Sequence, residues 1–192
     1  GYRDHGDGGT DASGDGADGG SSEDVRTGEG RGEQAGSESE GGGDGRRGRR
    51  FFFQLTPFPL YPYHFVPVLR EHTPQLLSAR SLEDMFALLE LAPGYTVLSN
   101  SDVEWAGASI LNHLHFQMLR GLRLPVLEAH PVPEASRRIP GGRVEFLDYP
   151  MAAFRFTGAA AGPLRAGAGR LLENWKSLDP GRNTVNLNLV RG

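Results

Sequence analysis

The sequence of 192 residues contains no cysteine. This absence excludes disulfides, thiolate nucleophiles and zinc sites with sulfur ligands. Long apolar runs are missing too: the run at 65–69 is far shorter than the roughly 20 residues of a membrane-spanning helix. The N-terminus also lacks the apolar segment of a secretory signal peptide. We therefore predict a cytoplasmic protein that does not associate with membranes.

Apolar residues are scarce in the first 50 positions, where glycine and acidic residues are abundant. Residues 1–50 hold 17 of the 28 glycines, five apolar residues, 12 acidic residues and 7 arginines. Such a segment buries too little apolar surface to offset an ordering cost of about 1–2 kcal/mol per residue. We predict a disordered tail over 1–50 and one folded domain over 51–192.

The net charge of −4 belongs to this tail, because residues 51–192 hold 12 acidic and 13 basic residues. A nearly neutral domain is unlike a strongly basic nucleic-acid-binding module, so we expect no nucleic-acid partner. The arginine-rich end of the tail at 46–50 is interpreted as a solvated linker. Contact with a phosphate or an acidic partner is the alternative for this short segment.

From residue 51 onward the apolar periodicity predicts several strands and two helices. Strands are expected at 64–69, 95–100, 106–119, 143–149, 153–157 and 184–190. One helix is expected to begin at the capping-box-like segment 81–84 and to end at Pro93-Gly94, and the second spans 163–177. Strands in adjacent runs with only two helices favour an α+β fold with an antiparallel sheet over a doubly wound fold.

The segment 107–118 holds most of the side chains that could do chemistry. In a strand its side chains alternate between two faces. One face is expected in the core and carries Ile110, Asn112, Leu114, Phe116 and Met118. The other face carries Ser109, His113, His115 and Gln117. Four hydrogen-bonding side chains in a row suit a phosphate site better than a core.

Three interpretations of His113 and His115 remain open on these residues alone. The two could be metal ligands at i, i+2 spacing, with Glu128 as the nearest downstream carboxylate. They could be structural histidines in a polar sheet face. One of them could instead be a nucleophile toward phosphorus, because an imidazole is partly neutral at pH 7 and attacks without a separate base.

The segment His113-Leu114-His115-Phe116-Gln117 resembles the His-x-His-x-Gln motif of the nucleotidyltransferase branch of the histidine-triad superfamily. Other segments follow in family order: Tyr-Pro-Tyr-His-Phe-Val-Pro at 61–67, Pro-Gln at 74–75, Ser-Asn-Ser at 99–101, Gly-Ala-Ser-Ile-Leu-Asn at 107–112, Leu-Pro-Val at 124–126 and Asn-Leu at 186–187. This succession resembles the GDP-hexose phosphorylases, meaning the plant GDP-L-galactose and animal GDP-D-glucose enzymes. Bacterial relatives with Glu-His-Thr-Pro-Gln, here at 71–75, are equally similar. The resemblance covers about residues 51–192 and implies a histidine-triad-like fold.

The resemblance implies roles for individual residues. His115 would attack the α-phosphorus and form a nucleotidyl-histidine, and His113 would position it through hydrogen bonds. Gln117 would donate its amide to a non-bridging phosphate oxygen without offering a proton. Binding of the nucleotide or its phosphates is implied for His64, Asn100, Gly107, Ala108 and Ser109.

The activity implied by the resemblance is phosphorolysis of a nucleoside diphosphate sugar, GDP-hexose and phosphate giving hexose 1-phosphate and GDP. The alternatives are a dinucleoside polyphosphate phosphorylase or hydrolase, and an inactive nucleotide-binding fragment. The expected partners are the sugar nucleotide and inorganic phosphate, with no cofactor, no metal and a homodimer left open.

This sequence departs from the family at three places. The loop at 102–105 replaces a shorter, less acidic linker, so contacts near the phosphate are expected to differ. The family continues beyond the position of Gly192, which predicts a domain truncated at its C-terminus. Related uridylyltransferases carry a cysteine-containing metal site that this sequence cannot build.

Overall fold

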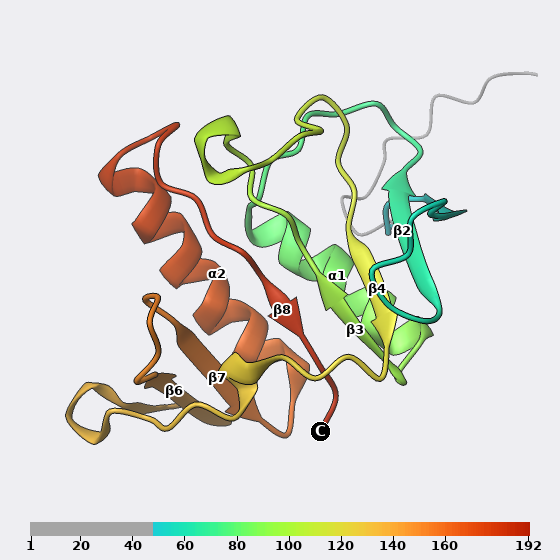
Figure 1. Ribbon diagram of the computed structural model, residues 1–192. Helices are drawn as coiled ribbons and strands as arrows, with labels where there is room; N and C mark the ends of the chain where they lie inside the picture. The colour runs from blue at the N-terminus through green and yellow to red at the C-terminus, as the bar shows by residue number, and fades with distance from the viewer. Residues whose placement is uncertain (1–47) are drawn as a thin grey trace, which may run out of the picture. The chain divides into compact units, whose positions relative to one another are not determined.

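The computed structural model describes residues 48–192. The predicted disordered tail lies outside the described residues except for its last three positions. Two antiparallel sheets and two helices make up the described part of the chain (Figure 1). The predicted α+β class with antiparallel strands is confirmed.

The larger sheet has the strand order β1-β2-β4-β3-β8, and every neighbouring pair in it is antiparallel. Its strands are β1 (Phe51–Leu55), β2 (His64–Leu69), β3 (Tyr95–Leu98), β4 (Gln117–Arg120) and β8 (Asn188–Leu189). The smaller sheet consists of β5 (Arg137–Ile139), β6 (Gly142–Phe146) and β7 (Phe154–Gly158). Strands β1 and β5 have no counterpart among the sequence predictions.

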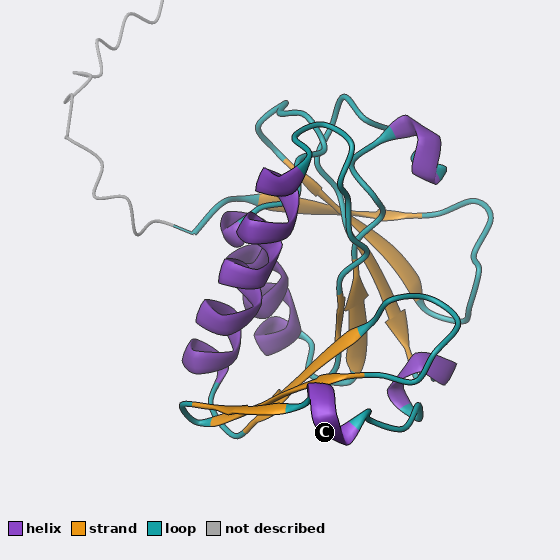
Figure 2. Ribbon diagram, turned by 90° about the vertical axis from the view of Figure 1, so that its left-hand side faces the viewer, coloured by secondary structure: helices purple, strands orange, loops and turns teal. Residues whose placement is uncertain are grey.

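The helices α1 (Ala79–Leu91) and α2 (Ala161–Leu178) lie side by side on one side of the strands (Figure 2). Helix α1 packs on the larger sheet and α2 contacts both α1 and β7. The core joins α1 to this sheet and its flanking segments through Met85, Leu88, Leu89, Val97, Leu114, Phe116 and Met118. Each such fully buried side chain contributes about 1.5–3 kcal/mol.

Helix α1 begins earlier than predicted. Its N-cap is Ser78, and the Ser78 amide donates to Ser81 Oγ at 3.2 Å. The Ser81 hydroxyl in turn donates to Leu76 O at 2.8 Å, and Ser81 is fully buried. The capping-box-like segment at 81–84 therefore lies inside the helix, because the serine three residues earlier takes the capping position.

The prediction of one strand over 106–119 is wrong in its first half. Residues 104–106 form a short 3-10 helix, and β4 itself starts only at Gln117. Between them the chain follows β2 through an isolated bridge of His115 with Val68 and a bond from Leu69 N to Leu114 O of 3.0 Å. Alternation therefore holds from residue 114 onward, but Ile110 is 52% exposed instead of lying in the core.

The residues just before β1 belong to the folded part of the chain. Arg49 forms an ion pair with Asp84 of α1, whose side chain is 5% exposed. Burial raises the pKa of Asp84 above its ordinary value, although the hydrogen bond and charge of Arg49 act in the opposite direction. The next residue, Arg50, accepts a backbone hydrogen bond from Arg70 at 2.8 Å. Arg49 is thus a structural residue and not part of a solvated linker.

In the part of the chain that the structure describes, no helix is long and apolar enough to cross a membrane.

Candidate functional site

His115 lies in the extended segment that leads into β4, and its ring is held at both nitrogens. Its Nδ1 is 2.9 Å from the backbone oxygen of His113. A carbonyl oxygen can only accept, so Nδ1 carries the proton. In the neutral ring Nε2 then carries the lone pair, and Asn100 Nδ2 donates a hydrogen bond to it at 3.0 Å. The residue is 5% exposed. This tautomer leaves Nε2 as the atom that can act as a nucleophile.

The ring of His113 has different partners from that of His115. Its Nε2 lies 2.6 Å from the backbone oxygen of Leu69, so this nitrogen donates and has no free lone pair. Its ring also packs against the ring of His72, with centroids 4.5 Å apart. His113 therefore supports the segment through its side chain and orients His115 through its backbone oxygen.

Gln117 is the first residue of β4 and lies on the same face as His115, two positions away. Its Oε1 contacts Nε2 of His64, the first residue of β2. His64 is buried, at 6% exposed. The structure thus joins His115 with Asn100 and His64 with Gln117, while His115 and Gln117 share one strand face.

Gln75 is not among the site residues predicted from the sequence, although the Pro-Gln pair at 74–75 is one of the segments that carry the family resemblance. Its buried side chain accepts from the His115 amide at 2.9 Å and donates to the His115 oxygen at 3.3 Å. The Gln75 amide also donates to Leu111 O at 2.9 Å. A loop residue 40 positions away thus takes the place of a neighbouring strand at His115.

Replacing Gln75 with leucine is expected to lower the free energy of unfolding by about 2 kcal/mol, because two backbone groups of His115 lose their partners. The melting temperature should fall by about 5 °C. Gln54→Leu on the exposed part of β1 is the matched control and should change the free energy of unfolding by less than about 0.5 kcal/mol. Chemical denaturation of both variants checks this, and equal losses in the two variants would contradict the stabilising role of the Gln75 hydrogen bonds to His115.

The small residues predicted to cradle a phosphate lie in the loop after the short 3-10 helix. Gly107 has φ +84°, a conformation that favours glycine, and its amide donates to Glu104 O at 2.9 Å. That amide is consequently engaged. Among residues 48–192, the amides of Ala108 and Ser109 and the Ser109 hydroxyl form no hydrogen bond within the protein. These groups remain as donors for an anion.

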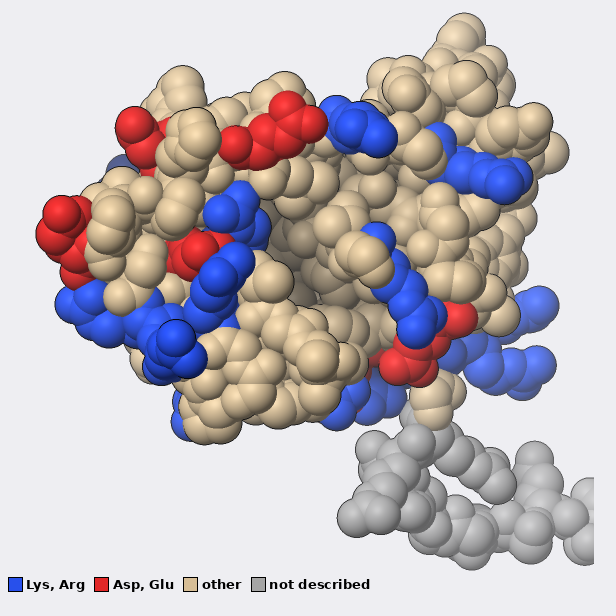
Figure 3. All heavy atoms as spheres, turned by 90° about the horizontal axis from the view of Figure 1, so that it is seen from below, with Lys and Arg blue, Asp and Glu red and all other residues tan. Residues whose placement is uncertain are grey.

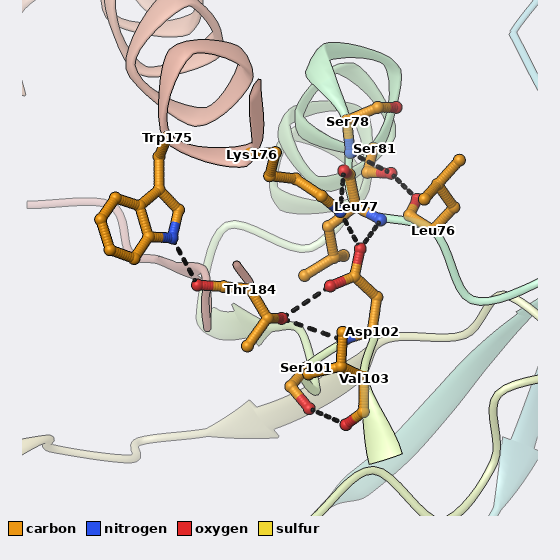
Figure 4. A network of polar contacts seen from close by, with 10 residues as sticks. All are labelled: Leu76, Leu77, Ser78, Ser81, Ser101, Asp102, Val103, Trp175, Lys176 and Thr184. Carbon is orange, nitrogen blue, oxygen red and sulfur yellow. Dashed lines mark hydrogen bonds and ion pairs between the residues drawn. The ribbon is translucent and has the colours of Figure 1, made fainter. Parts of the chain in front are cut away.

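Asp102 precedes this loop and the short 3-10 helix, and its side chain points toward Leu77, Lys176 and Thr184, as Figure 4 shows. Its carboxylate is 1% exposed and is paired with Lys176 of α2. It also accepts from the Thr184 hydroxyl at 2.6 Å and from the Leu77 amide at 2.9 Å. Burial by itself would raise the pKa of Asp102, but these three donors outweigh it and hold the pKa below its ordinary value.

The Asp102 network joins four separated segments of the chain at the base of the loop. Lys176 also donates to Leu77 O at 3.0 Å, and Trp175 Nε1 donates to Thr184 O at 2.9 Å. Because Asn100 precedes Asp102 by two residues, the network restricts where Asn100 can lie. The sequence predicted that this acidic loop alters contacts at the phosphate. The Asp102 carboxylate is paired with Lys176, and the predicted difference in phosphate contacts stays a prediction.

A cleft of about 390 Å³ opens beside the start of β3 and the end of β4. Gln117 lies at the other end of β4. On the side of the molecule seen in Figure 3, Lys and Arg side chains lie around a hollow together with Asp, Glu and uncharged residues. The cleft is lined by Thr96, Arg123, Leu124, Glu128, Val190 and Arg191, among others. Glu128, the carboxylate considered as a metal ligand, is thus placed away from His115. Within residues 48–192, no group of three His, Cys, Asp or Glu side chains is placed to hold a metal ion.

Two comparisons find proteins similar to this chain. A family described as a domain of unknown function (DUF4922) matches residues 44–120. This range contains every predicted site residue from His64 to Gln117. A galactose-1-phosphate uridylyltransferase of Bacillus subtilis is 30% identical over 129 residues, which are 67% of this chain and 25% of that protein. No solved structure matches.

Further relatives carry the same name. Galactose-1-phosphate uridylyltransferase 2 of Streptococcus pneumoniae is 29% identical over 131 residues, covering 67% of this chain and 26% of that protein. The enzyme of Lactiplantibacillus plantarum is 26% identical over 130 residues, covering 68% of this chain and 26% of that protein. The chain therefore spans about a quarter of the length of the curated relatives it matches. The narrower resemblance to GDP-hexose phosphorylases stays a prediction.

Proposed function

We propose that this chain transfers a nucleotidyl group from a nucleoside diphosphate sugar to a phosphate acceptor, through a nucleotidyl-His115 intermediate. The observation that carries the proposal is the tautomer of His115, with Nδ1–H on a backbone oxygen and a lone pair on Nε2. The similarity to galactose-1-phosphate uridylyltransferases supports nucleotidyl transfer involving a sugar phosphate. The small-residue loop at 107–109 supplies unused donors for the phosphates.

In the first step, Nε2 of His115 forms a bond to the α-phosphorus and the bond from that phosphorus to the bridging oxygen breaks. Hexose 1-phosphate leaves with the bond's electron pair. The ring becomes cationic, and its Nδ1–H bond to the His113 oxygen strengthens as charge develops. Asn100 must release Nε2 for this attack, and its amide can then donate to a phosphate oxygen.

In the second step, an oxygen of the acceptor phosphate attacks the same phosphorus and Nε2 recovers its lone pair. Gln117 offers no proton to a leaving group, so the site suits leaving groups and acceptors that are already stable phosphates. With inorganic phosphate the product is the nucleoside diphosphate. With a second hexose 1-phosphate it is a new sugar nucleotide.

Two sugar nucleotides are proposed as donors of the nucleotidyl group. The His-x-His-x-Gln motif and its flanking segments resemble those of GDP-hexose phosphorylases, which favours a GDP-hexose with inorganic phosphate as acceptor. The relatives' name favours a uridylyl group with a hexose 1-phosphate as acceptor. Both proposals use the same His115 chemistry and differ in base and acceptor.

Labelling tests the proposal directly. The protein is incubated with GDP-glucose or UDP-glucose carrying ³²P at the α position, without acceptor, and then denatured. We expect label on the denatured chain that is labile in acid and stable in base. When phosphate or hexose 1-phosphate is added before denaturation, we expect the label to be released as nucleoside diphosphate or as sugar nucleotide, respectively. Absence of label with both donors, or release only as the monophosphate in the presence of both acceptors, contradicts the proposal.

A further inference from the structure

His64 and Gln117 lie on neighbouring strands in a position that lets one orient the other. In the antiparallel pairing of β2 with β4, His64 lies opposite Leu119. Gln117 is two residues from Leu119 and therefore shares its face, as the diagonal neighbour of His64. The contact joins His64 Nε2 to Gln117 Oε1 and not to the amide nitrogen.

The other nitrogen of His64 determines which atom carries the ring proton. The backbone amide of Leu60 donates to His64 Nδ1 at 3.2 Å. An amide N–H can only donate, so Nδ1 holds the lone pair and the neutral ring carries its proton on Nε2. That proton is donated to Gln117 Oε1. Turning the Gln117 amide over would place two donors face to face, which this tautomer forbids.

The turn that supplies the Leu60 amide is itself held in an unusual conformation. Tyr63 has φ +57°, in the left-handed region that a bulky residue rarely adopts. The Tyr61 hydroxyl donates to Gly121 O at 3.4 Å, and the Arg120 guanidinium lies 5.7 Å from the centre of the Tyr63 ring. Arg120 ends β4, so the strand that begins with Gln117 also anchors the turn behind His64.

We propose that His64 is a positioning residue that holds the Gln117 carbonyl oxygen, so that the Gln117 amide NH₂ faces the reacting phosphate. In this hydrogen-bond relay, the Leu60 amide donates to Nδ1 of His64, and Nε2 of His64 donates to Oε1 of Gln117. The proposal rests on the proposed nucleotidyl transfer and adds the residue that selects between two orientations of the glutamine. His64 was predicted from sequence to line the nucleotide site; here it acts through Gln117.

The relay is tested first without any substrate. Protein labelled with ¹⁵N in histidine and glutamine is used for long-range ¹H–¹⁵N spectra, with His64→Phe and Gln117→Asn assigning the two signals. We expect His64 to be the Nε2–H tautomer and the Gln117 amide signals to shift in His64→Phe. An Nδ1–H tautomer, or a Gln117 amide that does not respond, overturns the proposal whether or not the protein is active.

The second test compares three variants at position 64 in the rate of label formation. The amide nitrogen of His64→Gln reaches the position of ring Nε2, whereas that of His64→Asn reaches only the position of Nδ1. Loss of an oriented donor costs up to about 10²–10³-fold in rate. We expect His64→Asn and His64→Phe to lose about 10–100-fold in rate at saturating donor, and His64→Gln to restore most of it, with nucleotide affinity unchanged within about twofold.

A double variant separates positioning from a structural role. If His64 acts through Gln117, then His64→Phe should cost nothing further in rate when Gln117 is already alanine. Additive losses, or equal losses in His64→Gln and His64→Phe, overturn the proposal. If the wild-type protein forms no label, nucleotidyl transfer fails as the function, and the tautomer measurement still decides whether the relay exists.

Discussion

Replacing His115 with alanine is expected to remove the covalent label and to slow nucleotidyl transfer by at least about 10⁴-fold. The reason is that Nε2 of His115 carries the lone pair of the ring, since Nδ1–H is bound to the His113 oxygen and Asn100 donates to Nε2. Removing a covalent nucleophile deletes the intermediate itself. The measurement is the rate of label formation and of turnover with labelled sugar nucleotide.

His113→Ala is the matched control for this prediction. The alanine variant keeps the backbone oxygen that binds His115 Nδ1 and loses only the ring contacts with Leu69 O and His72. We expect the label to persist and turnover to fall by less than about 10²-fold. Label that survives in His115→Ala and disappears in His113→Ala would reverse the two assignments. Equal melting temperatures establish that both variants are folded.

Replacing Lys176 with methionine is expected to destabilise the domain by about 3–5 kcal/mol at pH 7 and to lower the melting temperature by about 10 °C. Lys176 is the cation paired with the Asp102 carboxylate, which is 1% exposed. Methionine keeps the length of the apolar stem but leaves a buried carboxylate without its ion-pair partner. Arg170→Met on the exposed side of α2 is the control, with an expected change below about 0.5 kcal/mol.

The same variant has a defined pH dependence. The pKa of Asp102 in the folded protein is below its ordinary value, so its contribution is present above about pH 4 and is lost as pH falls through the folded pKa. Without Lys176 the carboxylate is protonated at a higher pH, which relieves the unpaired charge. The difference in free energy of unfolding between wild type and Lys176→Met should therefore shrink between pH 7 and pH 3. A constant difference would show that the loss is one of packing.

Several features of the domain were predictable from the sequence because they depend on neighbours along the chain. Alternation placed Leu114, Phe116 and Met118 in the core, and all three are buried. The strand at 64–69 has its predicted bounds, and the pattern Val185, Leu187, Leu189 packs its apolar side against the core. Both helices occur where apolar residues recur at helical spacing, with shifts of a few residues at their ends.

Other features depend on residues that meet only in the folded chain. The strand predicted over 184–190 pairs with β3 only at Asn188–Leu189, because pairing requires a partner strand and not a pattern alone. The start of α1 was misplaced because the competing serine at 78 caps the helix. Ile110 is assigned to the core only if alternation is extended across a loop, and in that loop Gly107 adopts a left-handed conformation (φ +84°) that no strand contains.

The sequence by itself determined the α+β class and the antiparallel pairing, since these follow from the order of strands and helices along the chain, and the shared face of His115 and Gln117, since this follows from alternation. Only the tertiary structure decided how those residues are held. Gln75 reaches His115 across 40 positions, His64 reaches Gln117 across 53, and Lys176 reaches Asp102 across 74. The nearby backbone groups of His113 and Leu60 set the tautomers of His115 and His64, but the side chains that bind the other ring nitrogens, Asn100 and Gln117, meet these rings only in the folded chain.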